Sequence, residues 1–289
     1  MPGWVKLLIK IVITGVCLWF VGRKIDWAQT LQIIRQGNML WLLAATLFFV
    51  ASKVVSSVRL NIYFKNINVN LSQKTNLRLY WLGMFYNLFL PGGIGGDAYK
   101  IILLNRTYNY PAKQLTAAVL LDRGSGVVGL GLLAGCYYYA LFTGNTIALL
   151  LLMATVPGLF IYYMFVKKLF PSFIQSFFST LCLGISVQAL QVVCAWCIMK
   201  ALGIEDHQSA YIFIFLLSSI VVSLPITIGP LGTREIVFLW GSTALLLNKG
   251  QSVSISISFF LITMLISLIG VYGVYKNPLG KTATSPISP

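Results

Sequence analysis

Six apolar stretches, each long enough to cross a lipid bilayer as a helix, occupy most of the sequence. A helix rises about 1.5 Å per residue, so about 20 apolar residues span the hydrocarbon core. Only 9% of the residues are charged, whereas a soluble domain carries about 25%. The sequence therefore predicts an all-α integral membrane protein with about six to eight transmembrane helices. The six stretches are residues 5–22, 39–57, 115–141, 147–166, 176–199 and 255–275.

Two further apolar regions are interrupted by motifs rich in glycine and proline. The segment 79–90 ends in LPGGIGGDAYK (residues 90–100), and the segments 210–224 and 236–247 flank LPITIGPLGTRE (residues 224–235). Both motifs contain Leu-Pro-x-x-Ile-Gly followed by charged residues. A helix of 12 residues rises only about 18 Å, which is too short to cross the bilayer. The two regions therefore indicate re-entrant hairpins, although 210–224 and 236–247 also fit two separate crossings.

The basic residues indicate how the chain is oriented. The 21 Lys and Arg residues against six Asp and Glu give a net charge of +15. In membrane proteins such residues collect in cytoplasmic loops, so the excess does not indicate nucleic-acid binding. With a cytoplasmic N-terminus and re-entrant hairpins, thirteen basic residues lie inside and five outside. This bias predicts cytoplasmic N- and C-termini in a bacterial or archaeal cell (inner) membrane, and an affinity for anionic lipids.

The order of the segments predicts a single transmembrane domain over residues 1–276, built as an inverted repeat. Residues 1–143 contain two spans, a hairpin entering from inside and a third span, and residues 146–276 repeat this order from the opposite side. Glycine- or proline-broken segments at matching places in two halves are typical of a transporter's substrate site. The alternative is that both motifs are ordinary membrane turns. Residues 277–289 are expected to form a short polar cytoplasmic tail.

The first motif has the composition of an anion-binding loop. Glycines let backbone amides approach a ligand closely, and the N-terminus of a helix attracts negative charge. Asp97 is expected to cap a helix over residues 98–104. Lys100 lies one turn later, where it is expected to meet a phosphate group.

The second motif places Arg234 and Glu235 directly before an apolar run. Thr233 is expected to cap this helix, with Glu235 favourable near its N-terminus. An arginine bordering membrane depth is a candidate functional residue, best paired with an acid or a lipid phosphate. The alternative is that Arg234 snorkels to the membrane surface.

A third motif, LLDRGSG (residues 120–126), opens an otherwise apolar stretch. Asp122 and Arg123 point about 100° apart on a helix, so they need not pair with each other. Asp122 is a candidate partner of Arg234 or of a proton. Arg123 is expected to face the headgroup region, as a binding residue or as an interfacial anchor.

The other reactive residue types argue against catalysis. His207 is the only histidine, so neither a histidine metal site nor a Ser-His-Asp triad is available. The six acids form no paired-carboxylate motif, and no nucleotide-binding GxxxxGK[ST] motif occurs. We therefore expect no catalytic residues, no metal and no cofactor, and we expect that the protein is not an enzyme.

Taken in order, these motifs resemble those of the lysylphosphatidylglycerol synthase transmembrane-region family, the flippase-like domain proteins. The resemblance covers residues 5–275 and rests on Asn87 with LPGGIGGDAYK, on LLDRGSG and on PITIGPLGTRE. In that family the membrane half of the multiple peptide resistance factor moves an aminoacylated phosphatidylglycerol between leaflets. Lys100 and Pro230 depart from the arginine and glycine expected at their positions. No aminoacyl-transfer domain follows residue 276, so the resemblance implies a stand-alone member that does not make the lipid.

The residues and the resemblance together predict a lipid flippase that is not driven by ATP. Its cargo would be an anionic or amphipathic lipid, whether aminoacylated, glycosylated or polyprenyl. Two alternatives remain: a non-catalytic lipid-binding or scaffold partner of a separate synthase or transferase, and a membrane enzyme acting on a lipid carrier. The candidate substrate-binding residues are Asn87, Pro91, Gly92, Gly93, Gly95, Gly96, Asp97, Lys100, Asp122, Arg123, Gly229, Gly232, Thr233, Arg234 and Glu235.

Overall fold

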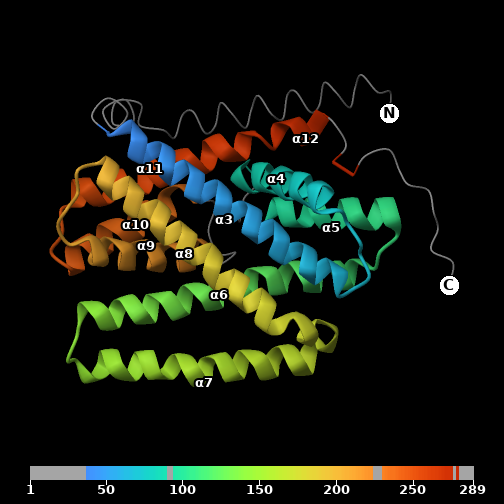
Figure 1. The fold of residues 1–289 in the computed structure, drawn as a ribbon, viewed down its shortest axis with the longest axis horizontal. Coiled ribbons are helices and arrows are strands. Elements are labelled where there is room, and N and C mark those ends of the chain that lie inside the picture. The colour runs from blue at the N-terminus through green and yellow to red at the C-terminus, as the bar shows by residue number, and fades with distance from the viewer. Residues whose placement is uncertain (1–36, 90–93, 224–229, 276–277, 280–289) are drawn as a thin grey trace.

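The computed structural model describes residues 37–89, 94–223, 230–275 and 278–279, and every regular element in these ranges is a helix (Figure 1). The predicted all-α class is therefore confirmed. The predicted first span, 5–22, and most of the predicted polar tail lie outside the described residues.

Five helices of the described chain are long and apolar enough to cross a membrane. Three of them begin at asparagines whose side chains accept a hydrogen bond from a backbone N–H of the first turn: Asn38, Asn145 and Asn248. Such side-chain capping satisfies one of the orphan amides of a helix start. The five are α3 (Met39–Lys65), α6 (Ala112–Leu141), α7 (Thr146–Leu169), α8 (Phe177–Ala201, preceded by the 3-10 helix Pro171–Ser176) and α11 (Lys249–Leu268), which is followed by the short α12 (Val271–Tyr275).

The predicted spans match these helices, with one instructive difference in α3. The sequence predicts an end at residue 57, whereas the helix continues to Lys65. Arg59 and Asn61, which broke the apolar pattern, are buried inside the protein. A polar residue rules out a membrane-spanning helix only where its side chain would face lipid. Arg59 and Asn61 are buried within the protein, so the helix continues past them.

Helix α7 has the surface expected of a lipid-facing element. Its apolar side chains are largely exposed, including Leu150, Met153, Val156 and Phe160. Of the most apolar 18-residue stretch of α7, only 6% is buried inside the protein. Figure 1 shows α7 at one edge of the bundle, beside α6. In a membrane this face contacts acyl chains, where exposed apolar surface costs nothing.

The two glycine-interrupted regions form helical hairpins. In the first, α4 (Gln73–Phe89) packs against α5 (Gly95–Tyr108). In the second, α9 (Gln208–Ser223) packs against α10 (Pro230–Ala244). All four helices are longer than the predicted segments, but each, at 14–17 residues, remains shorter than the roughly 20 residues that cross a bilayer as a helix. The turns themselves, residues 90–93 and 224–229, are outside the described residues.

The hairpins occupy matching places in the helix order, each between two long helices. The predicted boundary between the halves falls in the loop that joins α6 to α7. The halves also pack together, because α8 lies along both α3 and α6. A Cβ atom on Gly129 of α6 would lie 3.2 Å from backbone atoms of Gly184 in α8, so these helices approach closely, as expected for small residues at a membrane interface. That the halves are related by inverted symmetry remains a prediction.

Candidate functional site

One cavity of about 290 Å³ is lined by the ends of both hairpins that adjoin the undescribed turns. The first hairpin contributes Asn87 from α4 with Asp97 and Lys100 from α5. The second contributes Ser223 from α9 and Arg234 from α10. Helices α3, α6, α8 and α11 complete the wall. The structure thus brings residues from all three sequence motifs around one space.

Asp97 is the centre of an ion-pair cluster at the first hairpin. Its two carboxylate oxygens bind different cations: Lys100 Nζ lies 2.7 Å from Oδ1, and Arg123 Nε of α6 donates to Oδ2. The side chain is only 11% exposed. The cluster therefore ties α5 to α6 by charge-assisted hydrogen bonds, which are stronger than neutral ones.

This arrangement corrects the predicted capping role of Asp97. Helix α5 begins at Gly95, its N-cap is Ile94, and no side chain caps it there. Asp97 lies inside the first turn and uses its carboxylate on basic side chains instead. Lys100 and Arg123, predicted to meet a lipid phosphate, are bound to this carboxylate in the structure.

Asn87 of α4 ties the end of that helix to the start of α5. Its Oδ1 accepts a hydrogen bond of 2.8 Å from the backbone N–H of Gly96. The Gly96 amide, predicted to be available to an anion, is therefore engaged. Gly96 also permits the closest contact between α4 and α5, because a Cβ atom there would lie 1.8 Å from the carbonyl oxygen of Gly83.

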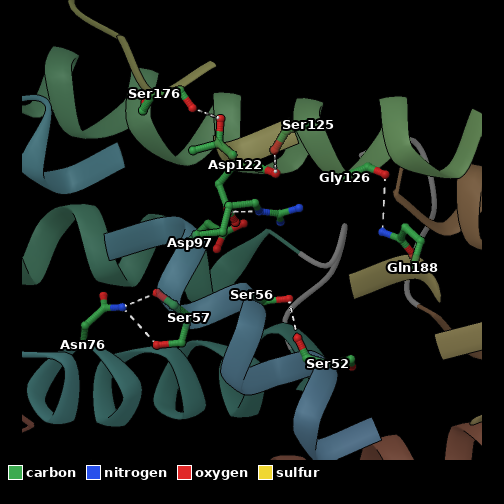
Figure 2. Close-up of polar contacts among 12 residues, drawn as sticks. Ser52, Ser56, Ser57, Asn76, Asp97, Asp122, Ser125, Gly126, Ser176 and Gln188 are labelled. Carbon is green, nitrogen blue, oxygen red and sulfur yellow. Dashed lines mark hydrogen bonds and ion pairs between the residues drawn. The ribbon is translucent and has the colours of Figure 1, made fainter. Parts of the chain in front are cut away.

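Asp122 pairs with Arg59 of α3 and not with Arg234, which was one of its two candidate partners beside a proton. Arg59 Nε lies 2.7 Å from Asp122 Oδ1, and both side chains are buried. A second hydrogen bond fixes the local helix, since Ser125 Oγ donates to the Asp122 carbonyl (Figure 2). This pair ties α3 to α6, and the pair of Arg123 with Asp97 ties α5 to α6, so α6 carries both anchoring contacts.

Arg234 lies at the second hairpin in an aromatic setting. The residue is only 9% exposed. Its guanidinium carbon is 4.6 Å from the centre of the Phe259 ring and 5.1 Å from that of Phe215. Its Nη1 atom is buried and has no hydrogen-bond partner among the described residues. The burial contradicts the snorkelling alternative.

The neighbours of Arg234 in the motif have structural contacts. Helix α10 starts at Pro230, so Gly232 and Thr233 lie inside its first turn and Thr233 is not the predicted cap. Glu235 accepts a hydrogen bond of 2.9 Å from Ser256 of α11. Gly95 starts α5. The remaining predicted residues, Pro91, Gly92, Gly93 and Gly229, lie outside the described residues.

Two cations of the cavity, Lys53 and Arg59, were not among the predicted site residues. Both belong to α3 and line the same space as the motif residues. Lys53 interrupts a long apolar stretch, and an ionisable residue inside such a stretch is a candidate functional residue by default. That signal was sufficient to select Lys53. Arg59 lies beyond the predicted end of the span, so only the longer helix reveals it.

Neutral polar side chains form another part of the wall. Gln188 of α8 is buried and its Nε2 donates to the Gly126 carbonyl at 3.3 Å (Figure 2). Gln191, Ser219 and Ser223 also line the cavity. Such groups supply hydrogen bonds to a polar ligand without adding charge.

The charges of the cavity wall are strongly unbalanced. Five cations line it, Lys53, Arg59, Lys100, Arg123 and Arg234, against the two carboxylates Asp97 and Asp122. The excess is three positive charges. Across the described ranges, no group of three or more His, Cys, Asp or Glu side chains is arranged to hold a metal ion. The arrangement is chemically suited to an anion.

Comparison with known proteins agrees with the fold and the motifs. Over 125 residues the chain is 26% identical to a UPF0104 membrane protein of Pyrococcus horikoshii; the match covers 43% of this chain and 36% of that relative, well under two thirds of its length. Comparison with solved structures gives no match. The model of the lysylphosphatidylglycerol synthase TM region matches residues 7–270. The chain is therefore an integral membrane protein that belongs to the lysylphosphatidylglycerol synthase transmembrane-region family.

Proposed function

We propose that the protein is a lipid flippase, which moves a lipid with an anionic headgroup between leaflets without using ATP. The observation that carries the proposal is the cavity between the two hairpin tips, with five cations against two carboxylates. A phosphate-bearing headgroup is costly to place in hydrocarbon, and a cavity lined by cations and neutral polar side chains offsets that cost.

The size of the cavity supports a headgroup as its occupant. Its volume of about 290 Å³ is near the lower end of the range of about 300–1,000 Å³ that is usual for small-molecule sites. A headgroup fits such a space, while the acyl chains stay in the bilayer. Exposed apolar faces such as that of α7 keep the protein in contact with those chains.

The Asp97 cluster supplies a means of coupling a headgroup to helix movement. Lys100 and Arg123 bind one carboxylate that joins α5 to α6. A headgroup phosphate offers the same cations equivalent oxygens and competes with Asp97 for them. Exchange of one acceptor for the other would release the tip of the first hairpin from α6, which opens the cavity on that side.

The test is transport by the purified full chain in liposomes that contain fluorescent phosphatidylglycerol. We expect loss of signal from the inner-leaflet probe, upon addition of a membrane-impermeant quencher, to be faster than in protein-free liposomes. Arg123→Gln should slow this transport at least about tenfold, which corresponds to about 1.4 kcal/mol. The matched control is Arg78→Gln, because Arg78 is exposed on α4 of the same hairpin and should transport normally.

Other results would redirect the proposal. If no labelled lipid moves faster than in protein-free liposomes, the flippase proposal fails. Mass spectrometry of co-purified lipids, combined with a search for a co-purified synthase, would then test the scaffold alternative. Chemical change in a bound lipid carrier during incubation would instead indicate an enzyme.

A further inference from the structure

The cations of the cavity fall into two groups with different partners. Arg59, Lys100 and Arg123 are each ion-paired with Asp97 or Asp122. Lys53 and Arg234 form no ion pair with a described residue and lie against aromatic rings instead. We propose that Lys53 and Arg234 form a binding subsite for a phosphate mono- or diester anion, separate from the ion-paired cations.

The contacts of Arg234 with aromatic rings leave its Nη1 atom available to donate a hydrogen bond to a ligand. The rings of Phe215 and Phe259 lie 5.1 and 4.6 Å from the guanidinium carbon. Aromatic rings attract a cation, but they accept no conventional hydrogen bond from its N–H groups and do not neutralise its charge. The buried Nη1 has no partner among the described residues. A buried donor of this kind is costly unless a ligand satisfies it.

Lys53 joins Arg234 through the same group of rings. Its Nζ lies 4.6 Å from the centre of the Phe49 ring, and Phe49 packs edge-on against Phe259 with ring centres 5.5 Å apart. The two cations thus rest on two rings that touch each other, and both line the cavity. Like charges brought together in a partly buried space repel, and a shared anion removes that repulsion.

The nearest motif carboxylate does not take the place of that anion. Glu235 follows Arg234 in sequence, but it is not part of the cavity wall. Its carboxylate accepts a hydrogen bond from Ser256 of α11. The two carboxylates that do line the cavity are bound to the other three cations.

This composition selects the ligand by charge. A phosphate anion gains from both cations, whereas a headgroup with a net positive charge meets an excess of like charge. The subsite should therefore prefer phosphatidylglycerol to a lysyl ester of the same lipid. The inference rests on the proposed function in treating the lipid headgroup as the source of the anion, but it is tested by binding, not by transport.

The experiment measures equilibrium binding to the purified full chain in uncharged detergent. Two probes separate the sources of the anion: inorganic phosphate alone, and water-soluble short-chain phosphatidylglycerol. The variants are Arg234→Gln and Lys53→Gln, with Arg234→Lys and Lys53→Arg as charge-conserving partners. Lys249→Gln, at an exposed residue, is the control. Gel filtration and circular dichroism verify that each variant is folded.

Each Gln variant should bind phosphatidylglycerol roughly 10- to 100-fold more weakly, the range expected for the loss of a charge-assisted hydrogen bond. The charge-conserving variants should recover part of the affinity, and Lys249→Gln should bind as the wild type does. Phosphate binding with the same dependence would identify the free anion as a sufficient ligand. Binding of phosphatidylglycerol without binding of inorganic phosphate would identify the lipid headgroup as the ligand.

Two results would overturn the inference. One is a wild-type protein that binds neither probe, and the other is a pair of folded Gln variants that bind as tightly as the wild type. Liposome transport distinguishes this failure from failure of the proposed function. Wild-type transport together with Gln variants that bind as tightly as the wild type would remove the subsite and leave the flippase. Subsite-dependent binding without any wild-type transport would remove the flippase and leave the subsite.

Discussion

The two helical hairpins share a motif and a cavity, yet their tips treat charge in opposite ways. At the α4–α5 tip, Asp97 binds two cations and Asn87 binds the Gly96 amide, so the described polar groups satisfy one another. At the α9–α10 tip, Arg234 lies against the rings of Phe215 and Phe259, and its buried Nη1 has no hydrogen-bond partner among the described residues. The contacts at the first tip stabilise the fold, whereas the second tip keeps a hydrogen-bond donor, Arg234 Nη1, that no described residue satisfies.

The difference shows that the repeated sequence phrase does not specify a repeated chemistry. The Leu-Pro-x-x-Ile-Gly phrase recurs. The first charged residue after it is Asp97 in one hairpin, which binds two cations, and Arg234 in the other, which lies against phenyl rings. Removal of charge should therefore have opposite consequences at the two tips. The following substitutions test that contrast, and unfolding in SDS titrations provides the free energies.

The largest effect is expected at Asp97. Asp97→Asn removes the common counter-charge of Lys100 and Arg123, and leaving the buried Lys100 charge uncompensated costs about 3–5 kcal/mol. The free energy of unfolding should fall by about that amount. Glu205→Gln is the control, because Glu205 is exposed and its nearest cation, Lys200, is 3.9 Å away. An unchanged stability for Asp97→Asn would mean that the first tip is not held by charge.

Asp122→Asn should have the next largest effect. It removes the partner of one cation, Arg59, and not of two. The loss of a hydrogen bond to a charged group predicts a decrease of about 1.5–3 kcal/mol in the free energy of unfolding. Asp122→Glu, which keeps the charge, is the matched comparison. A loss as large as that of Asp97→Asn would place the main anchor at α3–α6 instead of at the hairpin.

Glycine substitutions compare the packing of the two hairpins. In Gly96→Ala the added methyl would lie 1.8 Å from the Gly83 carbonyl oxygen, a backbone atom. Such overpacking costs about 1–3 kcal/mol. In Gly241→Ala of α10 the methyl meets only the Ile214 side chain, at 2.7 Å, which moves more easily. We expect Gly96→Ala to lower the melting temperature more than Gly241→Ala, and the reverse order would contradict the closer packing of the first hairpin.

Arg234→Met should change stability least and in the other direction. Replacement of a buried charge by an apolar side chain of similar length is often neutral or stabilising. We expect the free energy of unfolding to stay within about 1 kcal/mol of the wild-type value or to rise. A loss comparable with that of Asp97→Asn would show that Arg234 has a structural partner, which would remove the contrast between the tips.

Much of the fold was predictable because it depends on local composition. Each of the five described long helices coincides with a predicted span, and in both interrupted regions the two short helices pack against each other. That these pairs are re-entrant remains a prediction. The errors arose where a residue's role depends on a distant partner. Asp97 was expected to cap its own helix, and Asp122 to bind Arg234 or a proton. Instead, Asp97 binds Arg123 of α6 as well as Lys100 of its own helix, and Asp122 binds Arg59 of α3. A single sequence gives no means of choosing among such partners.

By itself, the sequence determined the membrane class, the helix order and the three motifs that line the cavity, because hydrophobicity and glycine placement act within a few residues along the chain. The tertiary structure alone decided which cations are neutralised and which are not. Ion pairing depends on distances of a few ångströms between helices, and α3 shows this most clearly: its Arg59 reaches Asp122, whereas its Lys53 lies on the Phe49 ring.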